Sequence, residues 1–194
     1  MNKNQLKDVL SFFHDSEKLK SVLRHSWLSS GRQESDPEHS WRMGIMAMVF
    51  APHLEDPVDL SRVLPMCMIH DIVEVYAGDY PAWNNKPVNK EELERESLRK
   101  LTQHLLPATA QYFHELWEEF EAGETNEAKF SIALDKLEVI MQHNEAPIDT
   151  WNKQEYEFNR VYGTEETNYD QLLRTFRRLL KEETDGKIEK EGKQ

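Results

Sequence analysis

The sequence predicts an all-α fold, and three of its features favour this class. Only 7 glycines and 8 prolines interrupt the 194 residues. The stretches between them are rich in helix-forming residues and show little of the alternation typical of strands. Hydrophobic residues make up 38% of the chain, which is enough for one sizeable core. We therefore expect one compact helical domain over residues 1–180, followed by a polar, flexible tail over residues 181–194.

The N-terminal part is expected to begin with two helices. The first runs from Asn4 to Arg24, and its apolar side chains should face the core at Leu6, Val9, Leu10, Phe13, Leu19, Val22 and Leu23. The second begins at Ser35–Glu38, where Asp36 suits the N-cap and Pro37 suits the first helical position. Its continuation, Met43–Phe50, is almost wholly apolar, which indicates a buried helix.

The third predicted helix begins at Asp56-Pro57 and ends near Gly78, a residue favoured just beyond a helix end. Its middle, Val63–Ile69, is apolar all round, which is typical of a central helix. Further helices are expected at Lys90–Leu106, Pro107–Ala122, Asn126–His143 and Thr167–Glu183. Between them, Asp79–Val88 is predicted to be a surface loop, and Asn144–Tyr162 to be ordered but irregular.

Composition excludes several classes of protein. A net charge of −12 argues against a protein that coats nucleic acids, because phosphate backbones attract basic surfaces. The sequence has no apolar run near the ~18 residues of a membrane span, and its first residues lack a signal-peptide pattern. The single cysteine, Cys67, excludes an intramolecular disulfide and fits a reducing compartment. We therefore expect a cytoplasmic protein without membrane or nucleic-acid partners.

The pair His70-Asp71 is the first candidate for chemistry. It directly follows the apolar run Val63–Ile69, and Glu74 falls on the same general helix face. An ionised carboxylate is costly to bury unless it is paired or bound to a cation. The pair therefore indicates either a metal site or a buried hydrogen-bonded pair that only joins helices.

His39 is the second candidate, since it lies in the first turn of the buried second helix. Helical bundles build metal sites from inward-facing ligands on separate helices, and nitrogen with carboxylate ligands suits a divalent transition metal. A histidine satisfied within the core is the alternative. The sequence contains no HExxH motif, paired CxxC motif, glycine-rich phosphate loop or Gly-x-Ser-x-Gly elbow. Most other kinds of metal site and of nucleophilic active site are therefore excluded.

The local hydrophobic pattern does not favour Asp135 as a functional residue. The apolar residues Phe130, Leu134, Leu137 and Met141 form a stripe, and Asp135 lies on the other side of the helix with Ser131, Glu138 and Gln142. Period alone therefore predicts that Asp135 and the adjacent Lys136 belong to a solvated face.

Taken in order, His39, His70-Asp71 and Asp135 resemble the signature of the HD-domain metal-dependent phosphohydrolases. The surrounding residues resemble the branch that holds a bacterial 5′-deoxynucleotidase and its eukaryotic HD-domain relatives. These motifs are Glu38–Ser40, His70–Glu74, Gly78-Asp79, Pro81, Glu115–Glu121 and Glu127–Phe130. The resemblance spans roughly residues 19–141 and implies a compact HD-domain helical bundle with the metal site between central helices.

The resemblance also implies roles for individual residues. His39, His70, Asp71 and Asp135 would hold a divalent ion, whether cobalt, manganese, magnesium or iron. Glu74 would be the catalytic acid or base. Arg24, fifteen residues before His39, would bind phosphate with support from Arg32, and Asp79 would help to hold the substrate.

One position departs from the deoxynucleotidase pattern. Bacterial members place a tryptophan directly after the arginine, where it helps to exclude a ribose hydroxyl. This chain has His25 at that position and Trp27 two residues later. The two side chains are therefore expected at the substrate, with an altered sugar preference.

The expected function is removal of phosphate from 2′-deoxynucleoside 5′-monophosphates. One alternative is a phosphohydrolase of nucleotide analogues or of di- and triphosphates, as in oxetanocin-type antibiotic pathways. Another is a non-catalytic helical module that binds a metal or nucleotide and regulates a partner. A cyclic-nucleotide phosphodiesterase is a further reading, for which His104 and His114 would have to be additional ligands. The resemblance also implies a homodimer, and the aromatic residues Trp151, Tyr156 and Phe158 would suit either an interface or the core.

Overall fold

Helices make up most of the protein. The computed structural model describes residues 1–81 and 88–191. Within these residues the helices are α1 (Lys3–Ser16), α2 (Asp36–Phe50), α3 (Leu60–Ile69), α4 (Glu74–Ala77), α5 (Lys90–Thr102), α6 (Pro107–Ala122), α7 (Asn126–Glu145), α8 (Glu155–Val161) and α9 (Gln171–Glu191). Short 3-10 helices lie at Glu17–Ser21, Ala51–His53 and Ile148–Thr150, and strands β1 (Leu23–Trp27) and β2 (Gln33–Ser35) pair in antiparallel fashion. The predicted helical class is confirmed, with one small hairpin added.

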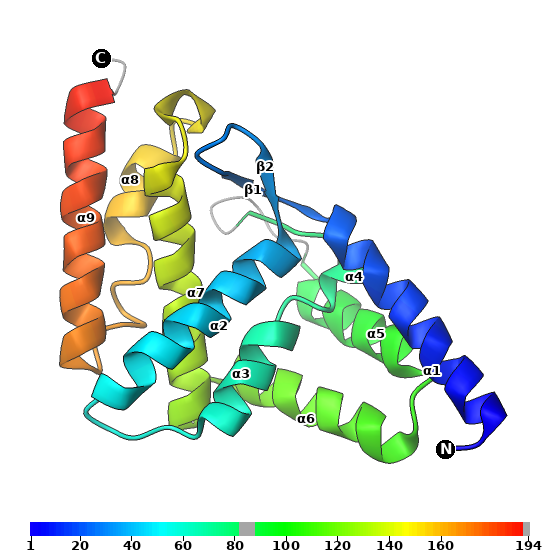
Figure 1. The fold of residues 1–194 in the computed structure, drawn as a ribbon. Helices are drawn as coiled ribbons and strands as arrows, with labels where there is room; N and C mark the ends of the chain where they lie inside the picture. The colour runs from blue at the N-terminus through cyan, green and yellow to red at the C-terminus, as the bar shows by residue number, and fades with distance from the viewer. Residues whose placement is uncertain (82–87, 192–194) are drawn as a thin grey trace.

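The long helix α7 lies between α2 on one side and α8 and α9 on the other (Figure 1). It packs against α2, α3, α6 and α9 and against strand β1. Because neighbours surround it, α7 buries polar side chains such as Asp135 and Glu138 as well as apolar ones such as Phe130 and Leu134. The prediction of a solvated face around Asp135 is therefore wrong. Hydrophobic periodicity detects an apolar stripe, but it does not reveal that a polar face is also covered.

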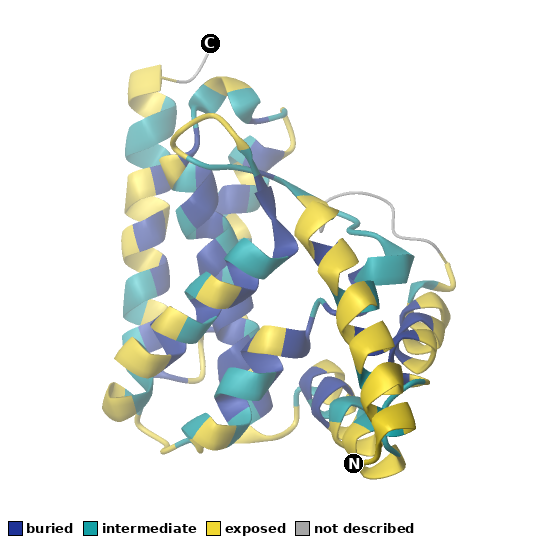
Figure 2. Cartoon of the chain, turned by 45° about the vertical axis from the view of Figure 1, so that its right-hand side comes forward, coloured by how far each residue is buried: buried dark blue, intermediate teal, exposed yellow. Residues whose placement is uncertain are grey.

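A second apolar cluster joins α3 to α1, α5 and α6. Phe12 of α1, Met66 of α3, Leu98 of α5 and Trp117 of α6 are among its buried members. Figure 2 shows the outward side of α1 as exposed along most of its length. The turn after α3, which carries His70 and Asp71, therefore lies between this cluster and the one around α7.

The N-terminal helix is shorter than predicted, because the α-helix ends at Ser16, a 3-10 helix follows, and the chain enters β1 at Leu23. Pairing of Leu23 with Ser35 in the hairpin overrides helix propensity there. Arg24 is consequently a strand residue. Of the predicted core side chains, Leu19 is buried, whereas four others are exposed: Leu6, Leu10, Phe13 and Leu23. Helix α1 lies at the edge of the molecule and buries only Phe12 in full.

Helix α2 also differs from its prediction, since only one side of its apolar part is buried. Met43, Met46 and Ala47 face the core. Trp41, Ile45, Met48 and Val49 are exposed. The helix begins within the predicted segment Ser35–Glu38. The N-cap, however, is Ser35 rather than Asp36, and it forms a capping box with Glu38.

The third predicted helix is divided in two. Asp59 caps α3, which ends at Ile69, and a turn over residues 70–73 leads into the short α4. Gly78, with φ at +78°, ends α4 as predicted. His70 and Asp71 thus occupy a turn instead of successive helical positions. The turn brings Nε2 of His70 to 3.0 Å from Oδ2 of Asp71.

The boundaries of the later helices agree with the predicted ones to different degrees. The bounds Pro107–Ala122 are confirmed, α5 ends four residues before the predicted Leu106, and α7 extends two residues beyond His143. The region predicted as irregular, Asn144–Tyr162, contains α8. Six residues of the predicted loop Asp79–Val88, numbers 82–87, lie outside the described residues.

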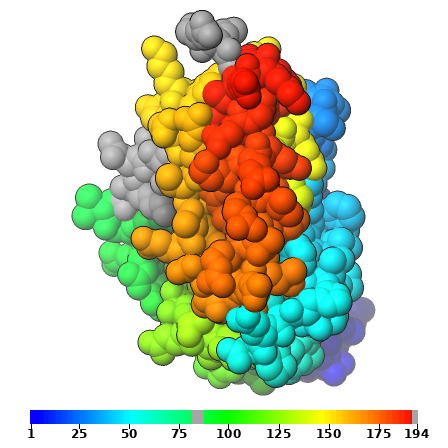
Figure 3. Space-filling model, turned by 90° about the vertical axis from the view of Figure 1, so that its left-hand side faces the viewer, coloured from blue at the N-terminus to red at the C-terminus, as the bar shows by residue number. Residues whose placement is uncertain are grey.

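The predicted flexible tail is helical as far as it is described. Helix α9 begins later than the predicted Thr167 and continues to Glu191, and residues 192–194 lie outside the described part. Buried Thr184 ties this region to α7, because its Oγ1 lies 2.8 Å from Oδ1 of Asn144. Figure 3 shows α9, in orange to red, running down the middle of one face of the molecule. In the described residues, no helix has both the length and the apolar character that crossing a membrane requires.

Gly163 provides a test of the packing between α7 and the end of α8. Its φ is +75°, and an added Cβ would lie 2.8 Å from Cβ of Lys136. We expect Gly163→Ala to lower the free energy of unfolding by at least ~1–2 kcal/mol, because the left-handed backbone and the contact both disfavour a side chain. Urea unfolding measures the change.

Gly186 of α9 is the matched control, since an added Cβ there meets nothing within 4 Å. Gly186→Ala should leave stability unchanged or raise it by up to ~1 kcal/mol. Equal stability of the two variants would contradict the packing described for Gly163.

Candidate metal centre and active site

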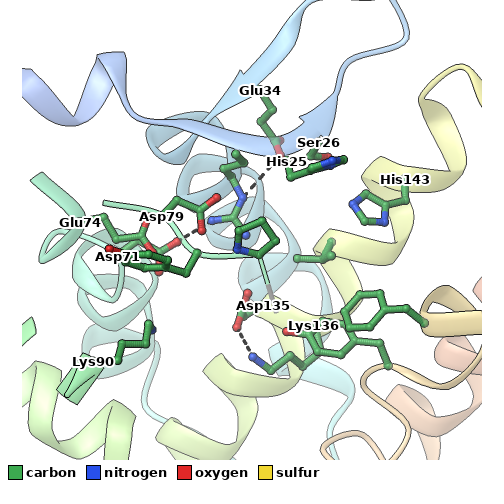
Figure 4. A pocket seen from close by; sticks show the side chains of 16 residues that line it. His25, Ser26, Glu34, Asp71, Glu74, Asp79, Lys90, Asp135, Lys136 and His143 are labelled. Atoms are coloured by element: carbon green, nitrogen blue, oxygen red, sulfur yellow. Dashed lines mark hydrogen bonds and ion pairs between the residues drawn. The ribbon is translucent and has the colours of Figure 1, made fainter. Parts of the chain in front are cut away.

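One pocket collects most of the predicted site residues. It has a volume of about 120 Å³ and is formed by the hairpin, the turn after α3, and helices α7 and α8. The described residues that line it are Arg24, His25, Ser26, Glu34, Asp71, Glu74, Asp79, Tyr80, Pro81, Lys90, Asp135, Lys136, Val139, His143, Phe158 and Tyr162. Figure 4 shows Glu74, Asp71 and Asp79 on one side and His143 on the other, with Asp135 and Lys136 between them.

Three predicted ligands meet at the base of this region. His39 comes from α2, His70 from the end of α3 and Asp135 from α7, and all three are buried. One potential ligand atom from each lies within 4.8 Å of the others. Residues distant in the sequence thus offer two imidazoles and a carboxylate to a single point, which is a ligand set that suits a divalent metal.

Hydrogen bonds orient both imidazoles. Nδ1 of His39 lies 2.5 Å from Oε2 of Glu138, and Nδ1 of His70 lies 3.1 Å from the carbonyl oxygen of Cys67. An oxygen acceptor at Nδ1 places the proton there, so Nε2 of each neutral ring keeps its lone pair. Among the described residues, Nε2 of His39 lies 3.2 Å from Oδ1 of Asp135 and Nε2 of His70 lies 3.0 Å from Oδ2 of Asp71. Neither buried Nε2 atom, however, has a partner in hydrogen-bond geometry. A metal ion would satisfy both atoms, and the residues therefore fit the implied group.

The charges around His39 favour a cation. Burial and the Arg24 guanidinium lower the pKa of His39, but Glu138 and Asp135 outweigh them and raise it to about 10. Burial alone would raise the pKa of Asp135, yet Lys136, His39 and His70 hold it well below its usual range. The cluster is therefore most stable with positive charge on or beside the imidazoles.

Asp71 lies between the histidine cluster and a second group of carboxylates. Its Oδ2 is 3.0 Å from Nε2 of His70 and 2.8 Å from Nη1 of Arg24. On its other side, Asp71 forms a compact acidic group with Asp36 and Glu74. Burial would raise the pKa of Asp71, but His70 and Arg24 lower it, so this carboxylate is ionised.

Arg24 is held by three acidic residues. Besides Asp71, its guanidinium lies 3.4 Å from Oδ1 of Asp36 and 3.8 Å from Oε2 of Glu34. The side chain is only 14% exposed and lines the pocket. These contacts fix a permanent positive charge beside the candidate metal ligands.

Glu74 and Asp79 also line the pocket, as the family pattern implies. Burial, Asp71 and Asp36 together raise the pKa of Glu74 to about 12. Burial likewise raises the pKa of Asp79. Glu74 can therefore carry a proton near neutral pH, and added positive charge nearby would favour its release.

The remaining predicted substrate residues divide into two groups. His25 lines the pocket, where Nδ1 lies 3.3 Å from Oε1 of Glu155 and burial lowers the pKa of the ring. Trp27 does not line it and packs edge-on against His25, with ring centroids 4.9 Å apart. Arg32 is also outside the pocket: its side chain is 55% exposed and is paired with Glu38. Arg32 lies just before β2, and its guanidinium contacts Glu38 in the first turn of α2. The structure does not bring Arg32 to the pocket, and its support of phosphate binding stays a prediction.

Sequence reasoning missed several residues of the site. Glu138 lies one helical turn after Asp135, and that spacing together with its charge could have suggested a partner for a ligand. Glu34 and Asp36 flank the start of α2, where only capping was considered. His104 and His114, the candidates for additional ligands, do not line the pocket. Lys136, His143, Phe158 and Tyr162 meet only through the packing of α8 against the rest, for which the sequence carries no local signal.

Comparison with known proteins identifies relatives across most of the chain. A sequence model of the HD domain family matches residues 16–176. Human 5′-deoxynucleotidase HDDC2 is 34% identical over 142 residues, which cover 72% of this chain and 68% of the human protein. The 5′-deoxynucleotidase hdd1 of Schizosaccharomyces pombe is 34% identical over 152 residues, covering 73% and 74% respectively.

Solved structures agree with this relationship. A protein from Magnetospirillum magnetotacticum, described as a "predicted metal-dependent phosphohydrolase", superposes with a TM-score of 0.81 at 33% identity. The alignment covers 95% of this chain and 97% of that one. A conserved hypothetical protein from Pyrococcus furiosus gives a TM-score of 0.68 at 26% identity, with 91% and 99% coverage.

The contact between Glu138 and His39 generates a prediction about metal affinity. We expect Glu138→Gln to weaken Co²⁺ binding roughly 10- to 100-fold, because residues that hold a histidine ligand have effects of this size. Titration of the metal-free protein with Co²⁺, followed by calorimetry, measures the change.

Glu145→Gln is the matched control on the same helix, since Glu145 pairs with Arg42 at 2.5 Å and is 46% exposed. It should bind Co²⁺ as the unmodified protein does. Unchanged affinity in Glu138→Gln would show that this carboxylate does not orient a ligand.

Proposed function

The chain belongs to the HD domain family, and we propose that it is a metal-dependent phosphohydrolase that removes phosphate from 2′-deoxynucleoside 5′-monophosphates. The convergence of His39, His70 and Asp135 on one point beside Arg24 and Glu74 carries this proposal. The relatives called 5′-deoxynucleotidases support the substrate class.

The proposed metal ligands are His39, His70, Asp71 and Asp135. Both imidazoles present Nε2, and both carboxylates lie next to these atoms. When bound, a divalent ion supplies positive charge to phosphoryl oxygens and makes water a better nucleophile near neutral pH. Cobalt, manganese, magnesium and iron all remain candidates, because mixed nitrogen and carboxylate sites accept each of them.

Three other pocket residues would bind the substrate and transfer the proton. Arg24 would donate charge-assisted hydrogen bonds to the phosphate, in an orientation fixed by Asp71, Asp36 and Glu34. Glu74 would accept a proton from the attacking water, aided by the positive charge that the metal and Arg24 place nearby. Asp79, on the same side of the pocket, would help to hold the substrate.

A phosphohydrolase of nucleotide analogues or of di- and triphosphates is the second candidate. The observation that favours it is His25, which lines the pocket at the position where bacterial deoxynucleotidases have tryptophan. Because Trp27 lies behind His25 and outside the pocket, it does not replace that tryptophan. The sugar would therefore meet an imidazole.

Homodimer formation and a cytoplasmic location also belong to the proposal. Exposed apolar side chains on α2, namely Trp41, Ile45 and Met48, recur on one helix face and would suit a dimer contact. Of the two alternatives that the sequence left open for Trp151, an interface or the core, the structure supports the core, because Trp151 is buried and donates a hydrogen bond to the carbonyl of His143.

A phosphate-release panel tests the proposed activity. With Co²⁺ or Mn²⁺ added, deoxynucleoside monophosphates should yield free phosphate. Glu74→Gln should lower kcat on the order of 100-fold or more while the protein still binds the metal, because it loses the acid–base group. Glu182→Gln, at an exposed position of α9, should keep the full rate.

Two results would overturn parts of the proposal. If nucleotides released pyrophosphate or tripolyphosphate while nucleoside monophosphates released no phosphate, the second candidate would be favoured. A full rate in Glu74→Gln would remove Glu74 from the mechanism.

A further inference from the structure

Lys136 is a half-buried cation that neither the family pattern nor the proposed mechanism uses. Its side chain is 22% exposed and lines the pocket beside Asp135. Nζ lies 2.7 Å from Oδ2 of Asp135 and 5.2 Å from the centre of the Tyr162 ring. Gly163 follows Tyr162 and has no side chain to displace the lysine stem. The end of α8 therefore encloses the ammonium group and keeps it at the pocket.

The two cations Arg24 and Lys136 flank the histidine cluster in the same manner. Arg24, from β1, contacts Asp71, which lies against Nε2 of His70. Lys136, from α7, contacts Asp135, whose Oδ1 lies 3.2 Å from Nε2 of His39. A phosphate bound at the cluster would thus lie between two positively charged side chains.

The charge balance of the pocket favours such a group. Five carboxyl groups and three cations are among its described lining residues. Of the cations, Lys90 is paired with Glu94 of its own helix at 2.5 Å. A phosphate monoester brings about −1.5 to −2 further charge near pH 7. Without Lys136, only Arg24 and the proposed divalent ion would oppose this charge in a pocket that already has an acidic excess.

We propose that the ammonium group of Lys136 is a second phosphate-binding cation, acting with Arg24 on the phosphate of the substrate. Lysine has three N–H donors, so contact with Asp135 leaves donors for a phosphate oxygen. The inference rests on the proposed function and extends it, because a site with two such cations favours a doubly charged monoester over a singly charged diester.

The test compares Lys136→Met, which keeps most of the length of the side chain without its charge, with Lys136→Arg. Lys129→Met, at an exposed position of the same helix, is the matched control. Calorimetry measures binding of Co²⁺ and then of inorganic phosphate to the Co²⁺-loaded protein, and phosphate release from deoxynucleoside monophosphates gives kcat/KM.

In Lys136→Met, phosphate binding and kcat/KM should fall roughly tenfold or more, the size expected for a lost hydrogen bond between charged groups. Co²⁺ binding should stay equal or become tighter, because a cation beside Asp135 is removed. Lys136→Arg should retain phosphate binding, and Lys129→Met should match the unmodified protein in every measurement.

Unchanged phosphate binding in Lys136→Met would overturn the inference. Parallel loss of Co²⁺ and phosphate would also overturn it, since Lys136 would then only support Asp135. Lys136→Gln provides the same comparison if the methionine variant does not fold. Phosphate binding needs no turnover, so this comparison still decides the role of Lys136 if the unmodified protein hydrolyses no nucleotide and the proposed function fails.

Discussion

The buried contact between His39 of α2 and two carboxylates of α7 is the interaction on which the rest of the site depends. Glu138 lies at 2.5 Å from Nδ1, and Asp135 lies at 3.2 Å from Nε2. All three side chains are buried, so each would destabilise the fold without a partner. Their mutual contact lets α7 cross the centre of the protein with a polar face inside. It also fixes which nitrogen of His39 faces the candidate metal position.

Charge of alternating sign extends outward from this contact. Asp135 is paired with Lys136, and Asp71 is paired with Arg24, so each carboxylate of the cluster has a cation behind it. A chain with a net charge of −12 can therefore present positive groups to a phosphate in one confined place. The acidic excess opposes binding of a long polyanion, whose charges would meet the outer surface. It does not oppose one small phosphate held among Arg24, Lys136 and a divalent ion.

Sequence alone predicted the helical class and, through the family resemblance, the residues that cluster. It did not predict the setting of those residues. Asp135 and Glu138 have the periodicity of a solvated face, and only the packing of α2, α9 and β1 around α7 shows that this face is covered. Arg24 was expected at the end of a helix, but the hairpin partner that draws it into a strand lies about ten residues later. Lys136 lies over the ring of Tyr162, a residue far from it in the sequence, and no local sequence pattern predicts that contact.

The most direct test of the metal centre is anomalous X-ray diffraction from crystals of the protein loaded with Co²⁺. We expect a cobalt peak at ~2.0–2.2 Å from Nε2 of His39, from Nε2 of His70 and from a carboxylate oxygen of Asp135, with Asp71 as the fourth protein ligand. Cobalt held only by exposed carboxylates, with both Nε2 atoms left unbound, would contradict the account.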